Sequence, residues 1–155
     1  MSYVIKSQPK NLNVYSTNAT IQTVGTTYID LEGSEVLYEP HPTAEKVIYE
    51  YTFGYQWFPD ANSIGQVIIQ KTNNGNYVSL DDEYRKIPIG TSSTAYGAST
   101  ASLFYVLDAW KGKEKIKLII RSYSSSYEFK VHSVRTYGQT VQDKKVFPTL
   151  RIYSI

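Results

Sequence analysis

The chain has 155 residues, the usual size of one domain and enough to bury a core without disulfide bonds. It contains no cysteine, which excludes disulfides and thiolate metal sites. A formal net charge of +2, from 16 basic and 14 acidic residues, is too balanced to indicate bulk binding to nucleic acid or to a membrane surface.

The residue types favour β-structure. The chain has 15 tyrosines and 5 phenylalanines but only 1 methionine. Aromatic and β-branched side chains fit a pleated, half-buried surface, and good helix formers are comparatively sparse here. No stretch approaches the roughly 18 apolar residues of a membrane-spanning helix. We therefore expect an all-β protein.

Residues 1–25 are expected to form an N-terminal arm and a first strand, followed by a sandwich domain over residues 26–155. The first 16 residues carry little hydrophobic pattern, and the first strand is predicted at 20–24. The opening Met-Ser-Tyr-Val-Ile lacks the basic and then apolar layout of a signal peptide. We expect a complete protein that is made in the cytoplasm.

Period-2 alternation marks the strands that follow. Short strands are predicted at 26–31 and 35–39, and the clearest strand at 46–53, where Val47, Tyr49, Tyr51 and Phe53 share one face. Later runs at 116–121, 127–131 and 146–155 alternate in the same way. About nine strands separated by turns rich in Gly, Pro, Asn and Ser favour an antiparallel β-sandwich or barrel.

One hairpin can be read almost directly from the sequence. Residues 65–71 and 77–80 flank Asn73-Asn74-Gly75-Asn76, and Asn-Gly supplies the positive φ angles of a tight hairpin turn. The segment 99–111 could be taken for a helix, but Leu103, Tyr105 and Leu107 alternate, which favours a strand. The small, polar residues 90–100 are predicted to form a loop.

Residues that could carry chemistry are few. His41 lies in a Pro-His-Pro turn, and His132 is placed by alternation on the polar face of a strand, where a surface or interface role is favoured. Asp81-Asp82-Glu83 offers oxygen ligands for Ca²⁺, but its spacing matches no calcium loop, and a solvated cluster is favoured. We expect no enzyme activity, no metal and no cofactor.

Two aromatic groups are candidates for contact with other molecules. Tyr55, Trp57 and Phe58 are predicted to follow the strongest strand as an aromatic loop that caps the sandwich or forms a subunit interface, with the interface favoured. The alternative is an exposed platform that stacks on sugar rings. Tyr123 and Tyr127 flank a polar turn and are further interface candidates. Alternating lysines at 111–117 could line a strand face, and a solvated edge is favoured there over a nucleic-acid surface.

Several segments resemble a known family. GSEVLYEP at residues 33–40, followed by KVIYEYTF at 46–53, is similar to the Gly-x-x-x-x-Tyr-x-Pro and Val-x-Tyr-x-x-x-Phe elements of tumour-necrosis-factor-like jelly rolls in phage structural proteins. The run from Ile116 to His132 and the ending FPTLRI at 147–152 resemble the same group. The resemblance covers about residues 26–155, whereas residues 54–110 and the first 25 match nothing definite.

The resemblance implies a homotrimer of jelly rolls on a virion, made in the host cytoplasm. A capsid decoration (cement) protein is favoured, with the major capsid protein or another virion protein as partner. The N-terminal arm, with Tyr3, Val4, Ile5, Lys6 and Tyr15, would then contact the capsid. The alternative is a receptor- or glycan-binding tip of a tail or head fibre. A jelly-roll enzyme with a metal among inward-facing histidines is disfavoured because there are only 2 histidines.

Overall fold

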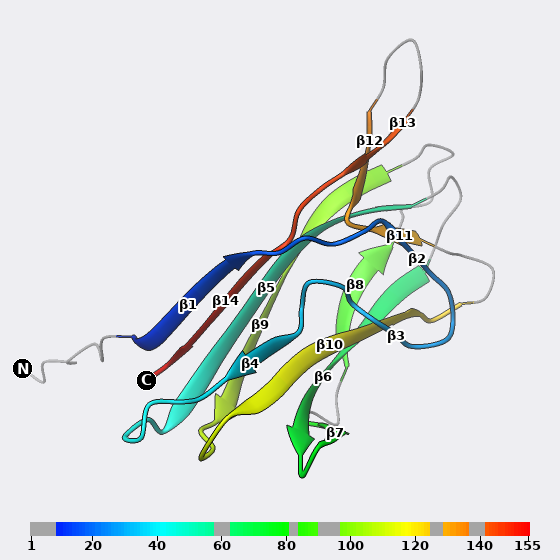
Figure 1. Ribbon diagram of the computed structural model, residues 1–155. Helices are drawn as coiled ribbons and strands as arrows, with labels where there is room; N and C mark the ends of the chain where they lie inside the picture. The colour runs from blue at the N-terminus through cyan, green and yellow to red at the C-terminus, as the bar shows by residue number, and fades with distance from the viewer. Residues whose placement is uncertain (1–8, 58–62, 81–83, 90–96, 125–128, 137–141) are drawn as a thin grey trace, which may run out of the picture.

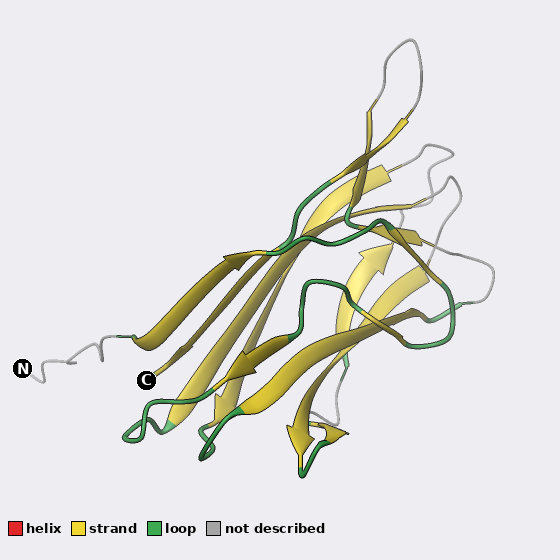
Figure 2. Cartoon of the chain, in the orientation of Figure 1, coloured by secondary structure: helices red, strands yellow, loops and turns green. Residues whose placement is uncertain are grey.

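The structure, a computed structural model, describes residues 9–57, 63–80, 84–89, 97–124, 129–136 and 142–155. Two antiparallel sheets face each other, and strands, turns and loops make up all of the described residues (Figure 1, Figure 2). In this part of the chain there is no helix long and apolar enough to cross a membrane.

The first sheet is built around the long strand β5 (Lys46–Trp57). β9 (Gly97–Asp108) pairs with β5 along its whole length on one side. On the other side, β14 (Thr149–Ser154) pairs with the first half of β5 and β11 (Phe129–Val131) with its end. β1 (Lys10–Ser16) extends the sheet beyond β14, and β2 (Gln22–Val24) extends it beyond β11.

The second sheet is built around β10 (Glu114–Ser122) and β6 (Ser63–Asn73). β3 (Ile29–Asp30) and β4 (Val36–Tyr38) both pair with the outer edge of β10. β7 (Asn76–Ser79) and β8 (Arg85–Ile89) both pair with the outer edge of β6. A separate two-stranded hairpin, β12 (Ser133–Thr136) and β13 (Gln142–Lys145), projects from one end (Figure 1).

The chain crosses repeatedly between the two sheets. β4 lies in the second sheet, β5 in the first, β6 to β8 in the second, β9 in the first, β10 in the second, and β11 and β14 in the first. This alternation of antiparallel strands confirms the expected fold class, a β-sandwich of jelly-roll type. The described residues form more strands than the nine expected, because β1, β8, β12 and β13 had not been predicted.

Inward-facing side chains of the two sheets form one core. The predicted alternation in β5 is confirmed, because Val47, Tyr49, Tyr51 and Phe53 are all buried. The tyrosine hydroxyls reach across to the loop that joins β3 to β4: Tyr49 donates to the carbonyl of Ser34 at 2.6 Å. Such hydrogen bonds explain how this core accommodates polar-tipped aromatic rings.

The predicted hairpin and the strand assigned over part of 99–111 are also confirmed. Asn74 and Gly75 have φ angles of 51° and 83°, as a two-residue turn between β6 and β7 requires. β9 runs through the segment that could have been helical, and it buries Leu103 and Tyr105.

The N-terminal segment differs from the expected arm. From Lys10 to Ser16 the chain is β1, which is hydrogen-bonded to β14, and so this part of 1–25 belongs to the sandwich. The register of β1 shifts between Lys10 and Asn13, and Asn11 has a φ of 51°. This bulge interrupts the alternation, which is why the strand escapes a period-2 search.

Candidate functional site: the outward face of the first sheet

The described residues contain no cluster of side chains that could bind a metal ion. No three His, Asp or Glu side chains among them lie close enough together to hold a metal ion. His41 is engaged within its own turn, where its Nδ1 lies 2.9 Å from the Thr43 hydroxyl. The acidic cluster 81–83 lies outside the described residues.

His132 is a buried residue, and its expected place on a polar strand face was wrong. Its side chain has no exposed surface, and its φ is 58°. The residue lies between β11 and β12, where its N–H donates to the Gly54 carbonyl at 2.8 Å. A left-handed residue reverses the alternation of side chains, so the ring turns inward toward Phe53 instead of outward.

Tyr55 does not belong to an exposed aromatic platform. It continues the inward alternation of β5, is 3% exposed and donates its hydroxyl to the Pro88 carbonyl at 2.9 Å. Trp57 is half-buried at the end of β5, and its ring lies over Gly97, where a Cβ would be 2.1 Å from it. The expected loop is therefore strand as far as Trp57, and Phe58 lies outside the described residues.

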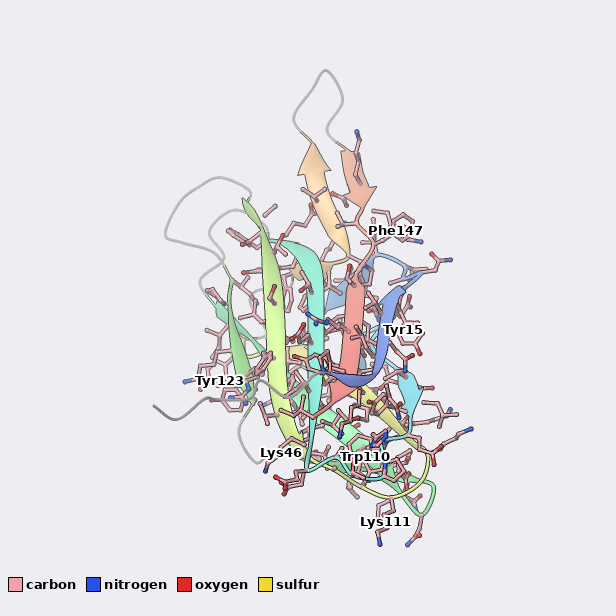
Figure 3. The ribbon with its side chains drawn as sticks, turned by 90° about the vertical axis from the view of Figure 1, so that its left-hand side faces the viewer. Tyr15, Lys46, Trp110, Lys111, Tyr123 and Phe147 are labelled. Carbon is pink, nitrogen blue, oxygen red and sulfur yellow. The ribbon has the colours of Figure 1, made fainter. Side chains whose placement is uncertain are left out.

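The other predicted contact residues are scattered. Tyr123 is 66% exposed at the end of the second sheet, away from Tyr15 on β1 (Figure 3). Tyr15 is exposed at the edge of the first sheet, and Tyr127 and the arm residues Tyr3, Val4, Ile5 and Lys6 lie outside the described residues. The structure thus does not bring the described members of these two groups together.

Among the described residues, several exposed apolar side chains lie on the first sheet, on the side away from the core. Figure 3 looks onto β9, β5, β14 and β1 side by side. The register pairs define two neighbouring rows, which we call the outward face: Tyr153, Ile48 and Val106 in one row, and Val14, Arg151, Glu50 and Phe104 in the other.

Apolar atoms dominate the outward face. Val14 is 60% exposed, and Phe104 and Val106 are each 54% exposed. Ile48 lies between Tyr153 and Val106 in the middle of its row and is only 4% exposed. Phe104 and Val106 lie two residues apart on the same side of β9, whereas Arg151 and Glu50 separate Val14 from Phe104. Neighbouring exposed apolar side chains such as Phe104 and Val106 are typical of interaction sites.

The charged side chains of the outward face, Arg151 and Glu50, pair with each other. The Arg151 guanidinium lies 3.6 Å from the Glu50 carboxylate and 4.8 Å from the centre of the Tyr153 ring. The Tyr153 hydroxyl donates to the same carboxylate at 3.3 Å. Because these charges already have partners within the sheet, a second surface could cover them without leaving either charge isolated.

Two pockets share Trp110 at one end of the sandwich, one lined also by Lys46 and the other by Lys111; Figure 3 labels the three residues. Trp110 packs edge-on against Tyr38, with ring centroids 6.1 Å apart, and the Lys71 ammonium lies 5.4 Å from the Trp110 ring. An ion pair of Lys46 with Asp108 closes one side. These groups provide packing and charge pairing but no nucleophile with a base.

The sequence of β9 already indicates the apolar outward face. Residues 103–107 read Leu-Phe-Tyr-Val-Leu, and a strand that is apolar on both faces is typical of one covered on both sides. Ile48 likewise places an apolar side chain on the otherwise polar side of β5. β5 and β9 therefore carry apolar side chains on both of their faces.

No protein-family model and no curated protein match the chain. Among solved structures it is similar to the Eiger TNF of S. frugiperda, with a TM-score of 0.37 and 8% identity over 87% of this chain and 91% of that one. It is also similar to a chain of infectious bursal disease virus, Gx strain, with a TM-score of 0.41 and 10% identity. That match covers 99% of this chain but 40% of the viral one. Similarities this distant carry no argument about function.

Proposed function

We propose that this chain is a non-enzymatic structural protein of a virion, a homotrimer that decorates the capsid. The proposal that the chain self-associates is supported by the outward face of the first sheet. It combines exposed apolar side chains on β1 and β9 with a central ion pair that is already satisfied. The assignment to a virion rests on the sequence resemblance of residues 33–53 and 116–152 to phage jelly rolls.

A second copy is the occupant that we propose for the outward face. Subunit interfaces combine an apolar centre with aromatic residues and arginine, and the outward face has Phe104, Tyr153 and Arg151. Most soluble oligomers contain identical chains, and a closed ring needs only one kind of contact repeated. Several weak contacts with the shell would then add through multivalency.

The fibre-tip alternative loses one of its expected platform residues. A platform that stacks on sugar rings needs exposed aromatic faces, and Tyr55 is buried in the core. Trp57 is half-buried and packed against Gly97. We therefore keep capsid decoration as the proposed role.

Cryo-electron microscopy of purified source particles tests the proposal. We expect threefold clusters of this jelly roll on the outer surface of the capsid, with the outward faces turned toward one another. Density confined to fibre or tail tips would favour the alternative role. Particles that lack the chain altogether would overturn the virion assignment.

A further inference from the structure

β9 forms a long and regular edge of the first sheet. All 12 of its residues pair with β5, from Lys46↔Asp108 to Trp57↔Gly97, without a register shift. Among the described residues, no strand pairs with the other side of β9. Its outer N–H and C=O groups therefore form a template on which a further strand can add.

The other edges of the two sheets carry the usual protection against strand addition. β1 is bulged between Lys10 and Asn13, and β8 contains Pro88 and two basic residues, Arg85 and Lys86. The remaining edge strands, β2, β3, β4 and β7, are only two to four residues long. Bulges, proline, charge and shortness each discourage pairing with another chain.

β9 has none of these features along its length. Its sequence, GASTASLFYVLD, contains no proline and no basic residue, and its single charge, Asp108, is at the end and is paired with Lys46. Phe104 and Val106 are exposed on its outward side. A long edge strand with exposed apolar side chains and no such protection is prone to pair with another chain, so β9 is a suitable acceptor for a further strand.

The N-terminal segment of the chain has the composition of such a strand. Residues 2–6 read Ser-Tyr-Val-Ile-Lys, with an aromatic and two β-branched residues in a row. The segment joins β1 at Lys10, which shares a row with Ser154, Val47 and Leu107 across the sheet. β1 and β9 flank β14 and β5 on opposite sides, so the donor end and the acceptor edge lie at opposite margins of one sheet.

We propose that residues 2–6 of a neighbouring copy add to the outer edge of β9 as an extra strand. This inference rests on the proposed self-association and identifies the contact that joins each copy to the next. A donor at one margin and an acceptor at the other make a head-to-tail contact, which generates a closed ring when the rotation between copies is right. Five extended residues span about 17 Å, enough to cover the apolar half of β9.

Engineered cysteines test the contact, because the natural chain has none. Phe104→Cys is combined with Val4→Cys or, in a second variant, with Ile5→Cys. Adjacent residues of a strand point to opposite faces, so one of the two arm positions shares the face of residue 104. Cross-strand Cα distances of about 4.5–5.5 Å suit a disulfide. The full-length protein is oxidised mildly and its native mass is measured in parallel.

We expect one of the two pairs to give a covalent trimer on a non-reducing gel, since each arm would be joined to the next copy around the ring. The matched control replaces Phe104→Cys with Val78→Cys, an exposed position on β7 of the second sheet, and should give no covalent trimer. Covalent dimers from Phe104→Cys alone would mean that residue 104 meets the same residue of a second copy, through facing outward faces or paired β9 edges, instead of an arm residue, and would overturn the inference.

Other outcomes separate this inference from the proposed function. A native trimer without arm-dependent crosslinks overturns strand addition and leaves self-association standing. A crosslink confined within single chains shows the arm folding back on its own sheet and also overturns the inference. A protein that is monomeric at all concentrations overturns both.

Discussion

His132 packs edge-on against Phe53, with ring centroids 6.0 Å apart and an angle of 64° between the ring planes. The imidazole lies at the junction where β11 leaves the edge of β5 and the β12–β13 hairpin begins. Its burial there lowers the pKa of His132 to about 4, and the neighbouring Glu32 carboxylate opposes part of this decrease.

Acid should therefore weaken the fold through His132. Between about pH 6.5, where the unfolded histidine titrates, and pH 4, the unfolded chain binds a proton that the folded chain does not. The stability that the neutral ring contributes is present above pH 6.5 and is lost as the pH falls to about 4. We expect a loss of about 3 kcal/mol over this range.

Urea unfolding at pH 7, 5.5 and 4 measures this effect. The variant His132→Phe keeps an aromatic ring without a titrating group, so its stability should fall less than that of the natural protein across these values. The control His41→Phe should keep the full acid dependence. Equal acid dependence in the natural protein and His132→Phe would remove His132 as the cause.

The hydroxyl of Tyr49 should matter for stability although it takes part in no reaction. Tyr49→Phe removes the donor to the Ser34 carbonyl and leaves that acceptor buried, which should cost about 1–3 kcal/mol in the free energy of unfolding. Tyr123→Phe, at an exposed position, should change it by less than about 0.5 kcal/mol. Chemical denaturation of both variants makes the comparison, and equal effects would contradict the role of the hydrogen bond.

Gly97 should be required for the position of Trp57. A Cβ at residue 97 would lie 2.1 Å from the indole ring, so Gly97→Ala must displace the ring and should destabilise the protein by about 1–3 kcal/mol. Displacement toward water should shift tryptophan emission to the red. The same substitution in Trp57→Phe should give a smaller shift, and an unchanged emission in Gly97→Ala would show that the ring is placed elsewhere.

The parts of the fold that the sequence predicted are those with one face in the core and one in solvent. β10 is such a strand, with Ile116, Leu118 and Ile120 buried in alternation, and the Asn74-Gly75 turn carries its own conformational preference. Residues 47–53 were assigned correctly for the same reason. The alternation continues to Tyr55, which shows that the strand prediction ended too early.

The features that were not predicted lie where the alternation of polar and apolar residues is interrupted or where both faces of a strand are apolar. The positive φ of His132 has no strong mark in the sequence, and the bulge at Asn11 hides β1. The exposure of Phe104 and Val106 was not predicted. An apolar run on both faces of a strand suggests a strand buried in the core, and only the strand pairing shows which face is exposed. The second copy that we propose to cover them is not encoded in any short motif.

The most direct measurement of the central claim is the mass of the purified protein by light scattering after size exclusion. Three chains of 17.6 kDa predict about 53 kDa for the natural protein. Val106→Glu places a charge on the outward face and should yield a folded monomer, whereas Val78→Glu, at a similarly exposed site on the second sheet, should keep the mass of the trimer. A natural protein that stays near 17.6 kDa at micromolar concentration, or a trimer that Val106→Glu leaves intact, would contradict assembly through the outward face.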